Sequence, residues 1–152
     1  MIVIKNTQKV ISIDVEKIKK DVQKILDILH YSDFDIGIWF TTNATIRKYN
    51  YTYRNKNKAT DILSFSFHPT LKAGERIQAH TQEEKNLGDL IISPEYVYKA
   101  AKDLHVTFEK RLRILLVHGI CHLLGYDHIN DNDYKKMHRK EQYILKALRA
   151  KN

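Results

Sequence analysis

Residues 107–128 read TFEKRLRILLVHGICHLLGYDH, and the rest of the expected fold is built around them. Thr107 and Glu109 are typical of a helix start, because a threonine hydroxyl can cap free backbone N–H groups and an acid suits the positive end of a helix. The apolar residues between Leu112 and Leu124 cover more than one helix face, which predicts a central and buried helix. Gly125 should end it, since glycine readily adopts a left-handed backbone conformation.

The segments on either side of this helix alternate between strand-like and helix-like patterns. Strands are expected at residues 2–4, 10–13, 34–40, 63–67 and 87–92, where β-branched or alternating apolar residues predominate. Helices are expected from Asp14 to about His30, from Thr42 or Asn43 to Tyr49, from Ser93 with its hydroxyl as a cap, and from about Asn132 onward. The expected fold class is therefore α+β, with a small mixed β-sheet packed against helices and with the buried helix at the centre.

Length and composition predict one ordered domain over residues 1–152. With 43% hydrophobic and 29% charged residues, the chain is neither low-complexity nor disordered in composition. The single cysteine, Cys121, cannot form an internal disulfide, and the sequence starts with no secretory signal pattern, so a cytoplasmic location is expected. The apolar runs are far shorter than the roughly 20 residues that span a bilayer, and no membrane association is expected.

The basic residues are unevenly distributed along the chain. The formal net charge is +8, and residues 36–60 contain no acid. That segment carries Arg47, Lys48, Arg54, Lys56 and Lys58, interleaved with Tyr49, Tyr51 and Tyr53. Cations that bind phosphates, beside rings that stack on unpaired bases, favour single-stranded nucleic acid as a partner. The alternative is that the tyrosines pack internally and the basic residues only solvate a surface.

His118, His122 and His128 form the most informative cluster in the sequence. Residues four apart on a helix lie on one face, so the imidazoles of His118 and His122 can reach one ion. The turn expected at Gly125 can bring His128 back beside them. Three imidazoles leave one coordination position open, which is typical of catalytic zinc, while nickel, copper and iron also accept such ligands. The alternative is that the first two rings are hydrogen-bonded core histidines.

Neighbours of this cluster permit more than one interpretation. Asp127 either orients a histidine ring or forms the turn, whereas Cys121 is expected to be a small buried apolar residue. The histidine spacing is also that of metzincin proteases, but Gly119 stands where those enzymes carry the glutamate that takes a proton from metal-bound water. The spacing therefore indicates a three-histidine hydrolase, and the basic stretch favours a phosphodiester as the bond attacked.

The segment from His118 to His128 resembles the signature of the YbeY family of bacterial endoribonucleases that mature ribosomal RNA. Further similarity follows in the family's order at Tyr49-Asn50 to Tyr53-Arg54, Thr60 to Phe65, Leu87 to Asp89, and Met137 with Glu141. The resemblance implies one zinc ion held by His118, His122 and His128, and Arg54 as the active-site arginine. Ala59, in place of a common proline, and Cys121, in place of leucine, are mild departures.

By this resemblance the chain is expected to be a hydrolase that cleaves single-stranded RNA in small-subunit ribosomal RNA processing and ribosome quality control. Its partners would be ribosomal RNA and the small ribosomal subunit. Arg54 and His118 are the expected catalytic residues: a zinc-activated water, or the RNA 2′-hydroxyl, attacks phosphorus while the arginine and the metal stabilise the transition state. Two alternatives stay open, a metal-dependent peptidase related to metzincins and a ribosome assembly factor that binds RNA without cleaving it.

Overall fold

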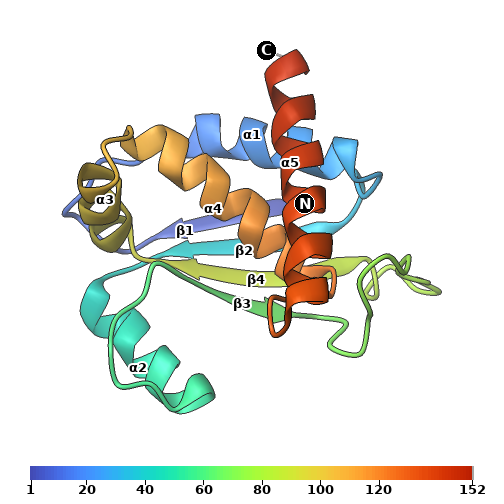
Figure 1. Ribbon diagram of the computed structural model, residues 1–152, viewed down its shortest axis with the longest axis horizontal. Helices are drawn as coiled ribbons and strands as arrows, with labels where there is room; N and C mark the ends of the chain where they lie inside the picture. Colours follow the sequence, from blue (N-terminus) through green and yellow to red (C-terminus); the bar gives the residue numbers. More distant parts are fainter. Residues whose placement is uncertain (152) are drawn as a thin grey trace.

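The computed structural model describes residues 1–151 of the chain, which form a four-stranded sheet and five helices (Figure 1). The strands are β1 (Ile2–Asn6), β2 (Asp35–Phe40), β3 (Ile62–Ser66) and β4 (Asn86–Ile92). The helices are α1 (Val15–Ile28), α2 (Asn43–Arg54), α3 (Pro94–Asp103), α4 (Phe108–Leu123) and α5 (Asp131–Lys151). These elements confirm the expected α+β class. Among the described residues, no helix is both long and apolar enough to cross a membrane.

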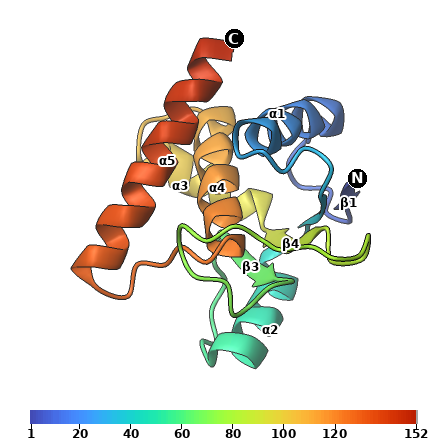
Figure 2. The same ribbon diagram turned by 90° about the vertical axis from the view of Figure 1, so that its right-hand side faces the viewer.

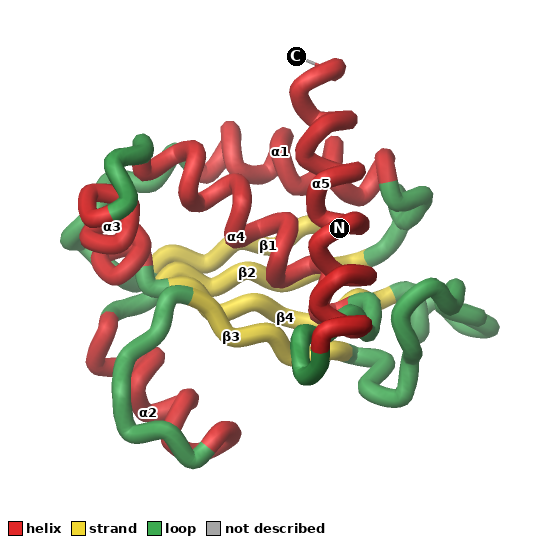
Figure 3. Tube along the Cα trace, viewed as in Figure 1, coloured by secondary structure: helices red, strands yellow, loops and turns green. Residues whose placement is uncertain are grey.

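The sheet is mixed, with the strand order β1-β2-β4-β3. Strands β1, β2 and β4 run parallel, and β3 pairs antiparallel with β4 at one edge. Helices α1, α4 and α5 lie over one face of the sheet, whereas α2 lies under the other face (Figures 1 and 2). The tube view shows the same two unequal helical layers around the yellow strands (Figure 3). Helix α4 lies between α1 and α5 and packs on β3 and β4.

Strand β2 presents alternate residues to two separate cores. Its buried residues are Ile36, Ile38 and Phe40. They belong to the large core under α1, α4 and α5, because successive strand residues point to opposite faces of the sheet. On the other face a smaller cluster forms under α2 from Ile46, Leu63 and Ile91. The half-exposed Trp39 packs against this smaller cluster, so the α2 side of the sheet has only a thin apolar cover.

The expectation of a strand at residues 10–13 is wrong, because this segment is part of the loop between β1 and α1. The buried side chain of Gln8 supplies the hydrogen bonds that a sheet would otherwise provide. Its Oε1 accepts the backbone N–H groups of Val10 and Ile11 at 3.0 and 2.9 Å, and its Nε2 donates to the carbonyl of Ile11 at 2.8 Å. β-Branched composition did not produce a strand here, since a local side chain already satisfies the backbone.

Helix α2 is longer than expected and continues through the basic stretch to Arg54. Thr42 caps its start by accepting the backbone N–H three residues further on at 3.2 Å. Asn55 ends it in the left-handed conformation, with φ of +55°. Ser93 is the N-cap residue of α3, as expected, but the expectation that its hydroxyl caps the helix is wrong, because the hydroxyl donates to Asn43 Oδ1 at 2.6 Å. This bond joins the start of α3 to the start of α2.

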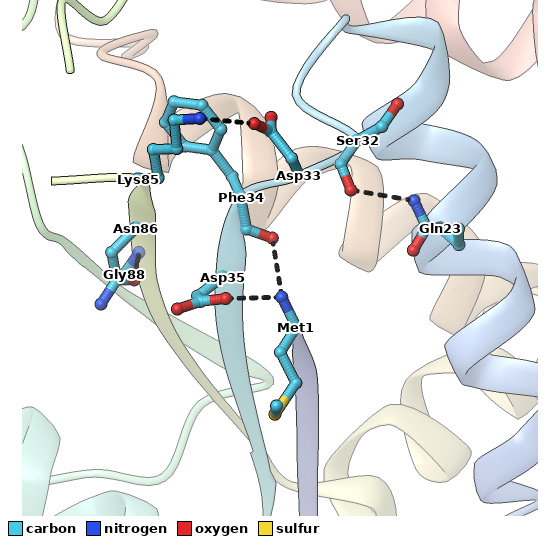
Figure 4. Close-up of polar contacts among 9 residues, drawn as sticks. All are labelled: Met1, Gln23, Ser32, Asp33, Phe34, Asp35, Lys85, Asn86 and Gly88. Carbon is cyan, nitrogen blue, oxygen red and sulfur yellow. Dashed lines mark hydrogen bonds and ion pairs between the residues drawn. The ribbon is translucent and has the colours of Figure 1, made fainter. Parts of the chain in front are cut away.

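Polar contacts fasten the starts of the parallel strands to one another (Figure 4). The amine of Met1 donates to the carbonyl of Phe34 at 3.3 Å and pairs with the carboxylate of Asp35. Lys85, which directly precedes β4, pairs with Asp33 at 2.8 Å. These contacts link β1, β2 and β4 at the end of the sheet that lies away from α3 (Figure 1).

Candidate metal centre

Helix α4 carries the first two histidines and packs closely on β3 and β4. Gly119 makes this approach possible, because a Cβ added there would lie 2.7 Å from Ile62 Cδ1 and 2.9 Å from Leu90 Cδ2. Strand β3 also binds the end of the helix, since Ser66 Oγ donates to the carbonyl of Leu123 at 2.9 Å. The C-terminal half of α4, and with it both imidazoles, is therefore fixed against the sheet.

Position 119 faces this apolar contact. A glutamate there, as metzincin proteases carry, would place its first side-chain atoms among the side chains of β3 and β4. Burying a carboxylate without a partner in apolar surroundings is costly. The fold therefore has no room at this position for the proton acceptor of a metzincin, which disfavours the peptidase alternative.

Gly125 turns the chain after α4 and returns it to the histidine-bearing face. Its φ is +92°, a left-handed value that glycine adopts without the steric cost of a side chain. A Cβ at this position would also lie 2.3 Å from the carbonyl oxygen of Leu71. After this turn, Asp127 Oδ1 accepts the backbone N–H of His128 at 2.8 Å. Of the two roles considered for Asp127, the observed hydrogen bond is that of a turn former.

The imidazoles of His118, His122 and His128 come together in one cluster. Each offers one ligand atom, and these atoms all lie within 4.8 Å of one another. The Nε2 atoms of His118 and His122 are 3.1 Å apart. Two nitrogens bound tetrahedrally to one zinc ion at about 2.0–2.1 Å would be roughly 3.3 Å apart. The first two rings therefore already have the spacing of a shared ion.

Hydrogen bonds at the Nδ1 atoms orient these two rings. His118 Nδ1 lies 2.7 Å from Glu141 Oε2 on α5, and His122 Nδ1 lies 2.9 Å from the carbonyl oxygen of Tyr126. A carboxylate and a carbonyl oxygen can only accept here, so Nδ1 of each ring carries the proton and donates it. The Nε2 lone pair of each ring then points into the cluster, where it can bind a metal ion. No role for Glu141 could be predicted from local spacing, because this residue lies on another helix and 23 residues further along the chain.

Burial and neighbouring imidazoles keep the ring of His122 neutral. Loss of solvation, followed by repulsion from His118 and His128, lowers the pKa of His122 to about 4. The neutral ring is the form that binds a metal ion. Three imidazoles oriented in this way form a donor set that fits a transition-metal ion. Because the first two rings line a cavity rather than the closed core, the alternative of two core histidines is disfavoured.

Cys121, next to His122 in the sequence, does not belong to the cluster. Its side chain is fully buried in the large core. Burial, with a smaller effect from the carboxylate of Glu141, raises its pKa to about 12. Cys121 is therefore a protonated packing residue, as expected from its position on an apolar helix.

The histidine cluster opens into a cavity of about 730 Å³ between the end of α2, β3 and the end of α4, here called the histidine cavity. Its polar lining includes Arg54, Thr60, Asp61, Ser64, Ser66 and the three histidines. Arg54 reaches the cavity from the last turn of α2. Among the described residues, its exposed guanidinium forms no ion pair with an acid.

The segment after α2 holds Arg54 beside the cavity. Buried Asn50 donates through Nδ2 to the carbonyl of Lys58 at 2.9 Å and so folds this segment back onto the helix. At its far end, Asp61 pairs with Arg111 of α4 at 3.7 Å. Contacts at both ends therefore tie the arginine-bearing helix to the histidine-bearing helix.

The fold and the site together define a class: an α+β protein with a three-histidine cluster, able to bind a metal ion, in an open cavity that also carries an arginine. The chain belongs to the endoribonuclease YbeY family, whose family model matches residues 3–149.

Known proteins resemble this chain over most of its length. It is 36% identical to the protein named endoribonuclease YbeY of Homo sapiens over 147 aligned residues. The alignment covers 97% of this chain and 87% of that protein. The Aquifex aeolicus protein of the same name is 36% identical over 134 residues, covering 88% and 83%. The solution structure of TM1509 from Thermotoga maritima has a TM-score of 0.64 and 25% identity, covering 99% of this chain and 91% of that one. The family expected from the sequence is therefore confirmed.

Proposed function

We propose that this protein is a zinc-dependent endoribonuclease that cleaves single-stranded RNA. One observation carries the proposal: the three imidazoles and the free guanidinium of Arg54 line the same cavity. A metal-binding cluster beside an unpaired arginine suits a phosphodiester, whose negative charge both groups can stabilise. Membership of an endoribonuclease family and the acid-free, basic stretch at residues 36–60 support RNA as the substrate.

His118, His122 and His128 are the proposed ligands of one zinc ion. Imidazole nitrogens also suit nickel, copper and iron, but three of them with an open fourth position are typical of catalytic zinc. When bound, the ion supplies a Lewis acid that polarises the phosphate group and acidifies water. The chain contributes orientation, because Glu141 and the carbonyl of Tyr126 hold the first two rings with Nε2 inward.

Arg54 is the proposed catalytic arginine. Its planar guanidinium can donate two parallel hydrogen bonds to the oxygens of one phosphate group. As water or the RNA 2′-hydroxyl attacks phosphorus, negative charge grows on these oxygens, and the guanidinium stabilises it. The P–O bond to the leaving ribose oxygen then breaks, and this oxygen takes up the proton that the attacking hydroxyl group loses to solvent. Because no described acid pairs with Arg54, binding a phosphate breaks no existing ion pair.

We extend the proposal to the processing of small-subunit ribosomal RNA and to ribosome quality control in the cytoplasm, with residues 1–152 acting as one domain. The family similarity and the net charge of +8 support ribosomal RNA and the small ribosomal subunit as partners. A positive surface raises the local concentration of polyanions and speeds their association.

Cleavage of labelled single-stranded RNA by metal-quantified protein tests the proposal. We expect about one zinc ion per chain, loss of cleavage after chelation, and recovery when zinc is added back. Arg54→Ala should reduce the cleavage rate by about 100- to 1,000-fold, with an unchanged unfolding midpoint because the side chain is exposed. Arg149→Ala is the matched control, since this exposed arginine lies near the far end of α5.

The alternatives give different results in the same assays. Cleavage of RNA that persists in fully metal-free protein would overturn the zinc-dependent mechanism. Zinc-loaded protein that binds RNA without cleaving it, and whose RNA affinity is unchanged by His122→Ala, would indicate an assembly factor. Chelator-sensitive cleavage of peptides without cleavage of RNA would indicate a peptidase.

A further inference from the structure

We propose that a groove on the α2 side of the sheet binds unpaired bases of the RNA strand whose phosphodiester lies in the histidine cavity. The inference rests on the proposed endoribonuclease function and extends it to the way in which the substrate strand is held. The groove has a volume of about 420 Å³ and is here called the aromatic groove. Its lining includes Val3, Lys5, Trp39, Tyr53, Phe65 and Asp89.

Strand register explains how residues far apart in the sequence share this groove. Val3 of β1 lies opposite Gly37 of β2, and Asp89 of β4 lies on the other side of Gly37. Phe65 of β3 is in turn opposite Asp89. Residues directly opposite one another point to the same face of a sheet, so this row crosses all four strands. Gly37 leaves room for the carboxylate of Asp89 in this row, because a Cβ there would lie 2.3 Å from Asp89 Oδ1.

Four aromatic rings connect the aromatic groove with the histidine cavity. Ring centroids are 5.6 Å apart for Trp39 and Tyr49, and 6.1 Å apart for Tyr49 and Tyr53, which stack at 14°. The rings of Tyr53 and Phe65 follow at 5.1 Å. Tyr53 and Phe65 line both the aromatic groove and the histidine cavity. An RNA strand that passes from the aromatic groove to the histidine cavity therefore crosses these two rings.

The side chains of the aromatic groove suit nucleobases. Tyr53 is 63% exposed, and an exposed ring can stack on a base of any identity. Lys5 Nζ lies 5.2 Å from the centroid of the Trp39 ring, which places a cation for a phosphate beside a ring for a base. The exposed carboxylate of Asp89 accepts no hydrogen bond from the described residues and can accept one from a base N–H group.

Little of the protein covers this face of the sheet. Helix α2 lies under one end of the strands and leaves their other end open (Figures 1 and 2). Val3 is accordingly 55% exposed, although it lies on a strand. The residues from 36 to 60, which supply both Trp39 and α2, include no acid. Lys5 and Asp89, the charged side chains of the groove lining, offset each other, but helix α2, which supplies Tyr49 and Tyr53 to the groove, carries three basic residues and no acid. Exposed rings beside this basic helix favour a polyanion with flat bases as the occupant over an apolar protein surface.

Trp39 provides the measurement, because it is the only tryptophan of the chain. Zinc-loaded protein is mixed by stopped flow with a single-stranded RNA of about ten nucleotides, long enough to extend beyond one small site. A base that stacks in the aromatic groove should quench Trp39 fluorescence saturably, before cleavage occurs. Duplex RNA of the same sequence should quench it far less, since its bases are already stacked and paired.

Two exposed valines offer a matched pair of variants. Val3 and Val10 are 55% and 62% exposed, and only Val3 lines the aromatic groove. Val3→Glu should weaken RNA affinity about tenfold, because it places a carboxylate where the strand passes and blocks stacking. Val10→Glu makes the same change in composition on a loop and should leave the affinity unchanged. Thermal unfolding of both variants verifies that each is folded.

The results separate this inference from the proposed function. If Val3→Glu binds as tightly as the wild type, or if Trp39 is not quenched by RNA that the protein still cleaves, the aromatic groove is not the binding site and the proposed function stands. If zinc-loaded wild-type protein cleaves no RNA, the proposed function is wrong, and absence of Trp39 quenching in the same mixture would overturn the aromatic groove as an RNA site as well. Quenching of Trp39 by RNA that the protein also cleaves, together with a tenfold loss of affinity in Val3→Glu but not in Val10→Glu, supports both.

Discussion

Glu141 Oε2 lies 2.7 Å from His118 Nδ1, and this contact makes α5 part of the candidate metal centre on α4. The two side chains are 17% and 28% exposed, so solvent screens their interaction only in part. The carboxylate selects the tautomer of His118 and makes its Nε2 a better electron donor. Helix α5 therefore does more than cover the core, because it orients a proposed metal ligand.

We expect Glu141→Gln to lower zinc affinity by about 10- to 100-fold. The amide oxygen can still accept the Nδ1–H group, but the negative charge that increases ring basicity is lost. Competition with a chromophoric chelator measures the affinity. Glu83→Gln, which removes an exposed glutamate from the loop before β4, is the control and should bind zinc like the wild type. Equal zinc affinities of Glu141→Gln and the wild type would show that this contact does not affect how strongly His118 binds zinc.

Gly125 and Gly74 provide a second matched comparison. Both have left-handed backbones, with φ of +92° and +89°, but only Gly125 is crowded by the carbonyl oxygen of Leu71. Gly74→Ala should cost about 1–2 kcal/mol of unfolding free energy from backbone strain alone. Gly125→Ala should cost about 1–3 kcal/mol more, because the loop must move away from the new methyl group. Urea unfolding measures both variants, and equal losses would contradict the steric contribution.

The parts of the site that follow from local spacing could be predicted from the sequence. His118 and His122 share a helix face, and Gly125 must turn the chain before His128, so one short segment contains most of the geometry. The alternation of buried and exposed residues along β2 could be predicted for the same reason, since it depends only on neighbouring residues. The position of Arg54 at the same cavity came instead from the family resemblance, since α2 and α4 meet only in the folded chain.

The remaining features depend on partners distant in the sequence or on competition between hydrogen bonds. Glu141 acquires its role only when α5 packs beside α4. The β-branched residues 10–13 satisfy the usual strand pattern, yet the side chain of Gln8 takes their backbone groups first. The Ser93 hydroxyl likewise binds Asn43 instead of capping its own helix. Tertiary packing decides the partners of Glu141 and Ser93, whereas a side chain only two or three residues away decides the conformation of residues 10–13.

Cys121 should resist chemical modification in the folded protein. It is the only cysteine of the chain and is fully buried, so a thiol reagent at pH 8 should react only after unfolding in guanidinium. Rapid labelling of the native protein would contradict the burial.

The Cys121 thiol should also make stability depend on alkaline pH. Since burial raises its pKa from 9.0 to about 12, the unfolded thiol ionises first as pH rises. The unfolding free energy should therefore decrease between about pH 9 and 12. This part of the decrease in unfolding free energy should be absent in Cys121→Ala, which has no thiol to ionise.

His122 should make the stability of the metal-free protein depend on acid pH. Desolvation and the neighbouring imidazoles lower the pKa of His122 from 6.5 to about 4. Between these two pH values, the ring binds a proton in the unfolded state but not in the folded state. The contribution is present above about pH 6.5 and is lost progressively as pH falls toward 4. An NMR titration of the ring in metal-free protein should give a midpoint near 4, whereas a midpoint near 6.5 would contradict the effect of burial. In His122→Gln, unfolding measured across the same pH range should lack this loss, because the titrating ring is absent.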